Sequence, residues 1–246
     1  MALLENLGQN RILAMLPQED LNRLRPHLAL VDGKHHQVVY PHGEPTEFAY
    51  FPLSGVVSLI ATDVDGRGVE MASVGCEGIV GVPGVLSGAG MIGDVVQQVS
   101  GLLVRVPVAA VREEIDRRSR LAVLIERYTV ALLSQIGQGS LCLRYHPVDV
   151  RAARWLLATH DRAGRDEFVL TQDFLALMLG ATRPQVSLAA ADLKRAGLIN
   201  YRYGRVTILD RDGLEGRACG CYGLIRAEVV RLLGSGENPA WAGVGG

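Results

Sequence analysis

The stretch TQDFLALMLGATRPQVSL, residues 171–188, decides how the chain is interpreted, because it contains two short helical patterns separated by a glycine. Thr171 can cap the first helix, since its hydroxyl can accept a hydrogen bond from a free amide of the first turn. Gly180 stands at the turn, where a residue without a Cβ tolerates a left-handed backbone. Thr182 can cap the second helix, and Pro184 is tolerated only in a first turn. The spacing therefore predicts a helix-turn-helix.

The second helix of this pair has two different faces. Val186, Ala190 and Leu193 share an apolar face, whereas Arg183 and Gln185 lie on the opposite side. Arginine is well suited to bidentate bonds with guanine, and glutamine can bond adenine or a phosphate. Solvated charges on an ordinary helix pair are the alternative, but the capped ends, the glycine turn and the outward arginine together favour DNA binding. The side chains expected to contact DNA are Thr171, Thr182, Arg183, Gln185, Ser187, Arg202 and Arg205.

A basic hairpin follows the helix pair. Residues 201–209, with Gly204 at their centre, have the pattern of two short strands, and Arg202 and Arg205 flank the turn. Two guanidiniums on a narrow loop suit phosphate contacts. Positive charge is focused here, although the whole chain has 25 basic and 26 acidic residues and a formal net charge of −1. We therefore expect a local anion site rather than a generally basic protein.

Length and composition favour two modest globular domains. The chain has 246 residues, of which 48% are hydrophobic and 21% charged, which excludes a chain disordered throughout. It contains no apolar run long enough to span a membrane and no signal-type leader. The four cysteines lack the density of a disulfide scaffold. We therefore expect a cytoplasmic protein with no membrane association.

The first half of the chain has the pattern of a β-roll. Thirteen of the 29 glycines lie between Gly33 and Gly101, where they separate short runs rich in β-branched and aromatic residues. Short strands at near-regular spacing predict a small barrel or jelly roll. Asp65-Gly66 supplies the positive φ angle that a tight hairpin needs.

A helical pattern replaces the strands after Pro107. From about Arg117 to Arg144, apolar residues recur at nearly heptad spacing, and the predicted rod is longer than one small domain needs. An ordinary core helix against the roll is the alternative to a dimer seam. The seam residues expected are Leu121, Ile125, Tyr128, Leu132, Ile136 and Leu143. His146-Pro147 ends the rod, because the residue before a proline avoids helical geometry, and a hinge is expected there.

The sequence resembles the Crp/Fnr family of bacterial transcription regulators from about Asn10 to Glu215. The most specific segments are 168–210 and the roll motifs YFPLSG (50–55) and VEMASVGCEG (69–78). The resemblance implies no enzyme but a homodimer that binds a two-fold symmetric double-stranded DNA operator, regulates transcription and contacts RNA polymerase.

The implied fold is α+β with four parts. These are an N-terminal double-stranded β-helix, or jelly-roll, sensor domain like a cyclic-nucleotide-binding domain (1–110), a long dimerisation helix (111–146), a C-terminal winged helix-turn-helix (147–215), and a C-terminal helix with a disordered tail (216–246).

The sequence departs from the cyclic-AMP-binding members of this family. Those members hold the ribose and the cyclic phosphate with a glutamate and, about ten residues later, an Arg-Ser pair; Val82 and Met91-Ile92 stand there instead. The segment 68–104 contains no basic residue, so a buried phosphate would have no charged partner. We expect a roll that does not bind cyclic AMP, no cofactor, and an unknown effector. The residues assigned to the effector pocket are Gly81, Val82, Pro83, Met91 and Ile92.

Histidines and cysteines suggest two alternatives. His35, His36 and His42 lie on the roll, as ligands do in cupin-like metal enzymes, but adjacent residues of a strand point to opposite faces. A metal enzyme or a haem- or metal-linked sensor is therefore the alternative function. Cys219-Gly-Cys221 is too closely spaced for a zinc site by itself, and the other cysteines are distant in sequence. Structural burial is expected, redox sensing is the alternative, and no metal is assigned.

Overall fold

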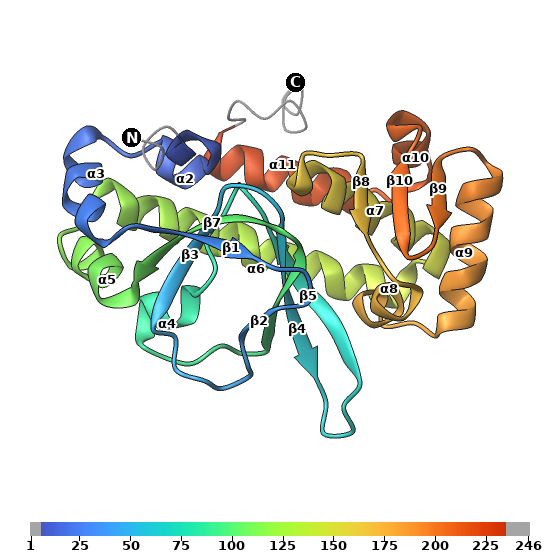
Figure 1. The fold of residues 1–246 in the computed structure, drawn as a ribbon, viewed down its shortest axis with the longest axis horizontal. Helices are drawn as coiled ribbons and strands as arrows, with labels where there is room; N and C mark the ends of the chain where they lie inside the picture. Colours follow the sequence, from blue (N-terminus) through green and yellow to red (C-terminus); the bar gives the residue numbers. More distant parts are fainter. Residues whose placement is uncertain (1–5, 235–246) are drawn as a thin grey trace.

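The N-terminal half of the chain is a β-roll. Figure 1 shows the computed structural model, in which residues 6–234 are described. The strands of the roll are β1 (Ala29–Gly33), β2 (Val38–Tyr40), β3 (Phe48–Pro52), β4 (Val56–Thr62), β5 (Gly68–Val74), β6 (Asp94–Val99) and β7 (Gly101–Pro107). They form two antiparallel sheets, ordered β1-β7-β3 and β2-β6-β4-β5. Alternating runs of β-branched residues account for these strands, because their inward side chains build the main hydrophobic core.

The long hairpin β4–β5 projects from the roll (Figure 1). Gly66 has a φ angle of 78°, and the Asp63 carboxylate accepts hydrogen bonds from the amides of Asp65 and Arg67 at 2.9 and 2.8 Å. The expected hairpin turn at Asp65-Gly66 is therefore confirmed.

Helices flank the roll and dominate the second half of the chain. The N-terminal ones are η1 (Leu7–Gln9), α2 (Arg11–Ala14), α3 (Gln18–Leu24) and η2 (Arg25–His27). The others are α4 (Val82–Ser87), α5 (Val108–Asp116), α6 (Arg120–Tyr145), α7 (Val148–Ala163), α8 (Gln172–Leu179), α9 (Arg183–Arg195), α10 (Arg211–Arg217) and α11 (Cys221–Leu233). A small sheet of β8 (Glu167–Val169), β10 (Arg205–Ile208) and β9 (Ile199–Arg202) completes the C-terminal half. The predicted fold class is confirmed, whereas α4 was not anticipated within the roll.

The long helix α6 covers the roll of its own chain, which corrects the predicted dimer seam. Leu121, Ile125, Tyr128 and Leu132 are all buried in the core that α6 shares with the roll, and Ile136 packs at its edge. They are thus unavailable to a second copy. The periodicity correctly identified an apolar face, but it did not specify which surface covers that face.

A second apolar stripe lies on the exposed side of α6. Val130, Leu133 and Leu141 are exposed, Leu133 to 62%. Gly137 falls between them, and a Cβ added there would meet no atom within 4 Å. The spacings of three, four and four residues place these positions along one side of the helix. Leu143, the last residue of the predicted seam, is instead close to Gly180 at the end of α8.

The C-terminal half packs directly against the roll through α7. The Nε1 of Trp155 donates to the Glu70 carboxylate at 2.8 Å, and Arg162 Nε donates to Glu77 at 2.7 Å. Burial raises the pKa of Glu70. These contacts place the helix-turn-helix at one end of the molecule (Figure 1).

The chain reverses direction after the small sheet, so that α11 lies along α6 (Figure 1). The helix expected at 222–233 is confirmed as α11. The tail that was expected to be disordered falls almost entirely in residues 235–246, which lie outside the described residues.

Candidate nucleic-acid interface

The helix-turn-helix is built by local hydrogen bonds and one glycine. Thr171 Oγ1 accepts the amide of Phe174 at 3.1 Å, which fixes the start of α8. Gly180 ends α8 with a φ angle of 53°, in the left-handed region. The side-chain oxygen Oε1 of Gln185 accepts a hydrogen bond from the backbone amide of Thr182 at 2.9 Å, which fixes the start of α9. The two helices meet at 105°, an angle suited to a helix-turn-helix.

The recognition helix α9 is held by its apolar face. Val186, Ala190 and Leu193 are buried, as the pattern predicted, and Ala189 joins them. Arg183 begins the opposite face, and its side chain is 65% exposed. Among residues 6–234 it forms one ion pair, with Asp173 at 3.4 Å. Both side chains of this pair are largely exposed, so the pair contributes little to stability. The guanidinium is therefore free to exchange Asp173 for a nucleic-acid partner.

The hairpin of β9 and β10, called the wing below, lies beside α9. Lys194 Nζ donates to the carbonyl of Tyr201 at 3.3 Å, and the Tyr201 hydroxyl donates to the Leu170 carbonyl at 2.8 Å. Burial, with the nearby Asp173 charge, raises the pKa of Tyr201 to about 12, so the phenol stays protonated and able to donate. Tyr203 and Gly204 both have positive φ angles, 52° and 70°, as a type I′ turn requires.

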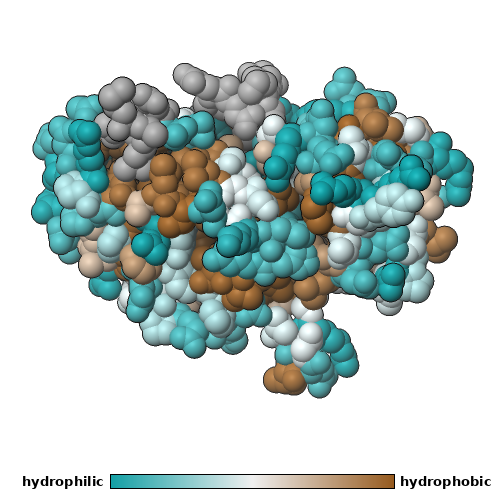
Figure 2. All heavy atoms as spheres, in the orientation of Figure 1, coloured by the Kyte–Doolittle hydropathy of each residue, from teal (hydrophilic) through white to brown (hydrophobic). Residues whose placement is uncertain are grey.

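The wing arginines are exposed. Arg202 lies over the ring of Tyr203, 4.8 Å from its centroid, and Arg205 pairs with Glu167 at 3.1 Å on the surface. Figure 2 shows hydrophilic residues with scattered hydrophobic ones at the end of the molecule where α9 and the wing lie. This surface thus combines exposed cations with scattered apolar side chains, as DNA-reading surfaces do.

Two family models match the two halves of the chain. A Crp-like helix-turn-helix domain matches residues 150–217, and a cyclic nucleotide-binding domain matches residues 32–118. The chain belongs to the Crp/Fnr family of transcription regulators.

Individual relatives agree with this family. The CRP-like cAMP-activated global transcriptional regulator of Mycobacterium tuberculosis is 26% identical over 202 residues, which cover 79% of this chain and 90% of that protein. FixK2 from Bradyrhizobium japonicum has a similar fold, with a TM-score of 0.66 at 19% identity over 78% of this chain and 98% of that one.

The c-di-GMP-responsive regulator CLP of Xanthomonas campestris has a TM-score of 0.63 at 18% identity, over 78% and 99% of the two chains. The match to the Crp-like helix-turn-helix domain and the similarity to the Mycobacterium regulator confirm the expectation of a transcription regulator rather than an enzyme. Among residues 6–234, no single helix is long and apolar enough to cross a membrane, and only α8 and α9 taken as a bent pair meet those criteria.

Not every predicted DNA-contacting residue of this Crp/Fnr protein projects freely. Ser187 donates to the Gln172 side chain at 2.6 Å, and so ties α9 to α8. Gln185 uses its carbonyl oxygen for the cap, which leaves its amide NH₂ available. Thr171 and Thr182 act as caps at exposed helix starts. That these side chains contact DNA stays a prediction.

Part of the exposed surface of α9 is apolar, which the predicted DNA-contacting residues did not include. Pro184, Leu188 and Ala191 are exposed, Leu188 to 68%. Their spacing of four and three residues places them on one side of the helix, so the helical period was the signal that could have found them. Apolar side chains in the major groove recognise the methyl group of thymine.

The five residues assigned to the effector pocket do not share one environment. Gly81 has a φ angle of 101° and begins α4, which Pro83 helps to start. Val82 and Met91 pack in the core of the roll, whereas Ile92 is 71% exposed. Gly81 is buried as well, and Pro83 is half-buried, so Ile92 is the one exposed member of the five.

The roll also carries an open hollow that sequence reasoning missed. It encloses about 540 Å³ and is lined in part by Tyr40, Glu47, Tyr50 and Arg105. The Arg105 guanidinium lies 4.4 Å from the centroid of the Phe48 ring. Tyr50 of β3 is paired in register with Arg105 of β7, and alternation puts Phe48 on the same face of the sheet, which only the strand pairing reveals.

Two of the three roll histidines, His35 and His36, lie near the helix-turn-helix. His35 Nδ1 lies 2.6 Å from the Gln98 carbonyl oxygen, and burial lowers the pKa of His35. The His36 ring lies 4.8 Å from the ring of Phe174 on α8. Within residues 6–234, none of the three roll histidines joins a group of potential metal ligands.

Proposed function

We propose that this Crp/Fnr regulator is a homodimer that inserts α9 of each copy into the major groove of a two-fold symmetric operator. The observation that carries the proposal is the exposed guanidinium of Arg183 at the start of α9. This helix has a capping box at its N-terminus and a buried apolar face that holds it against the rest of the domain. Arg183 would read a guanine, and Leu188 a thymine methyl group. Arg202 and Arg205 on the wing would bind phosphates.

The dimer would form along the exposed stripe of α6. Val130, Leu133 and Leu141 are apolar and face solvent, and Gly137 leaves space for a second backbone to approach. Two copies of a helix that is 26 residues long would bury this stripe against each other. The operator half-sites would then lie one helical turn apart.

The roll would respond to a signal other than cyclic AMP. Val82 and Met91 supply no hydrogen-bond donor or charge, and no lysine or arginine lies in segment 68–104. A cyclic phosphate buried there would lose its hydration without gaining a counter-charge. We therefore do not expect this chain to respond to the effectors that the names of the Mycobacterium and Xanthomonas relatives state.

The remaining expectations follow from a DNA-binding role. A regulator of this type would act in the cytoplasm of a bacterium and contact RNA polymerase through residues that we do not assign. The domain boundaries near residues 110, 146 and 215 stay predictions. The mechanism proposed is a two-state reorientation of the winged helices about His146-Pro147, biased by the state of the roll.

The test is selection of duplexes from a randomised pool by the full-length protein, followed by competition binding. We expect enrichment of two-fold symmetric sequences, and relaxed discrimination at one base pair per half-site in Arg183→Ala. Arg195→Ala is a matched control, because that arginine is exposed at the far end of the same helix. Failure to enrich any symmetric sequence would contradict the proposal.

A further inference from the structure

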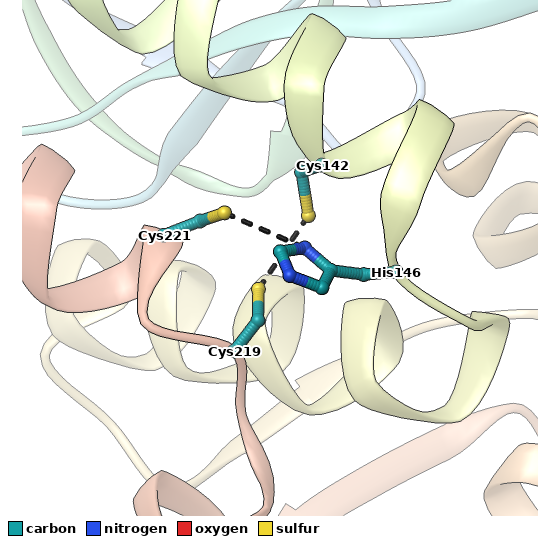
Figure 3. A group of neighbouring side chains, drawn as sticks. All are labelled: Cys142, His146, Cys219 and Cys221. Carbon is teal, nitrogen blue, oxygen red and sulfur yellow. Dashed lines mark hydrogen bonds between the residues drawn. The ribbon is translucent and has the colours of Figure 1, made fainter.

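Four metal-ligating side chains converge where α6, α7 and α11 meet (Figure 3). Cys142 lies in the last turn of α6 and His146 caps its end, so the spacing of four residues puts both on one side. Cys219 and Cys221 precede and begin α11. The four ligand atoms all lie within 4.8 Å of one another, and the three cysteines are buried.

The separations match the edges of a small tetrahedron. Cys142 Sγ lies 3.5 Å from Cys219 Sγ, and Cys221 Sγ lies 3.5 Å from His146 Nδ1. Zinc bonds of about 2.3 Å to sulfur and about 2.0 Å to nitrogen would place two sulfurs about 3.8 Å apart, and a sulfur and a nitrogen about 3.5 Å apart. A disulfide would need about 2.05 Å between the sulfurs. Two of the six separations thus match those expected around one tetrahedral zinc ion, and the other four are no longer than 4.8 Å.

We propose that Cys142, His146, Cys219 and Cys221 bind a single thiophilic divalent metal ion, zinc, in a closed tetrahedral site. Three thiolates and one imidazole are a donor set typical of structural zinc. An iron–sulfur cluster would place several iron and sulfide atoms between the thiolates, and would need wider spacing.

Neighbouring groups suit such a centre. Gln138 Nε2 donates to Cys221 Sγ at 3.0 Å, as outer-shell partners of metal ligands do. Zinc with three thiolates carries a net charge of −1, and the guanidiniums of Arg151 and Arg154 interact electrostatically with Cys142. Arg151 is buried, and its Nε has no hydrogen-bond partner among the described residues. An anionic metal centre would compensate this buried charge.

The location gives the metal a structural consequence. His146 lies two residues before α7, where the chain enters the winged-helix half, and Cys219 lies two residues after α10, where the chain leaves it. One ion would therefore clamp both ends of that half to the end of α6. Arg151 also donates to the carbonyl of Leu179, the last residue of α8, which connects the centre to the helix-turn-helix.

The experiment measures metal directly and needs no DNA, so its outcome is independent of the proposed DNA binding. Full-length protein purified under reductant is expected to contain one zinc ion per chain by plasma mass spectrometry. Cobalt(II) exchanged into the site should give thiolate charge-transfer bands and the intense visible bands of tetrahedral cobalt. In a thiol assay, one cysteine should react at once, and three more only after a chelator is added.

Variants separate ligation from folding. Cys219→Ser and Cys142→Ser should lower zinc affinity by more than about 100-fold, since loss of an outer-shell partner alone lowers it about 10- to 100-fold. Cys76→Ser, which removes the cysteine outside the cluster, should retain one zinc ion. Reduced wild-type protein that binds neither added zinc nor cobalt would overturn the proposal. Equal zinc affinity in Cys219→Ser, or a metal-free Cys142–Cys219 disulfide that persists under reductant, would do the same.

Discussion

Replacing Glu77 by glutamine tests how firmly the winged-helix half is held against the roll. Arg162 Nε lies 2.7 Å from Glu77 Oε1, and both side chains are only 2% exposed. Burial disfavours the charged guanidinium, but the Glu77 carboxylate more than offsets this and raises the pKa of Arg162. Glu77→Gln keeps the shape but removes the counter-charge. Because a buried charge without its partner is costly, we expect the free energy of unfolding to fall by about 3 to 5 kcal/mol.

Urea unfolding followed by circular dichroism measures this change in stability. A control variant and a double variant are measured beside Glu77→Gln. Glu113→Gln is the matched control, since Glu113 pairs with Arg117 on the surface at 3.5 Å and should change stability by less than about 1 kcal/mol. The double variant Glu77→Met/Arg162→Met should recover most of the loss, because an apolar pair of similar size can replace a buried ion pair. A Glu77→Gln loss no greater than that of Glu113→Gln, or a double variant as unstable as the single one, would refute the reasoning.

Four further outcomes are expected. Arg183→Ala should lose about 1 to 3 kcal/mol of binding free energy at one base pair per half-site, and gel-shift competition that finds unchanged discrimination would remove Arg183 from base reading. Leu133→Glu should give a folded monomer by sedimentation, whereas Ile125→Glu should unfold the roll core; a dimeric Leu133→Glu would contradict the proposed stripe. The hydrogen bond from Arg23 lowers the pKa of Glu114, so this carboxylate contributes its full stabilisation above the unfolded value of 4.5 and loses it as the pH falls through the folded pKa; Glu114→Gln should therefore destabilise at pH 7, and by progressively less below pH 4.5, in denaturant titrations. Cyclic AMP should give no saturable heat in calorimetry, and micromolar binding would overturn the interpretation of Val82.

Local chemistry made the helix-turn-helix predictable. The hydrogen bonds that fix the starts of α8 and α9 join residues only three positions apart, Thr171 with Phe174 and Thr182 with Gln185. Gly180 ends α8 through its own backbone conformation, so neighbouring residues determine both helices and the turn. The same holds for the hairpin turn at Gly66. A contact can be predicted from the sequence when its two residues are near neighbours along the chain.

Partners distant in sequence were not predictable in this way. The heptad-like stripe from Leu121 to Leu132 showed that α6 has an apolar face, but a roll of the same chain and a second copy of α6 produce the same pattern. The cysteine cluster joins residues 77 positions apart, Cys142 and Cys219, and only the antiparallel return of α11 along α6 brings them together.

The arrangement of contacts around α7 bears on how a signal would reach DNA. On one side, α7 bonds to the roll through charged or polar pairs such as Arg162 with Glu77 and Trp155 with Glu70. On another, it passes beside the cysteine cluster, where Arg151 links to the end of α8. A buried polar pair stabilises the fold only while both partners are present and correctly charged. Neutralising one partner therefore breaks the pair but does not disturb the apolar contacts around it. Because α7 also shares an apolar core with Val56, Ile60 and Val99 of the roll, we expect a change of charge at either side of α7 to weaken its packing on the roll without releasing it.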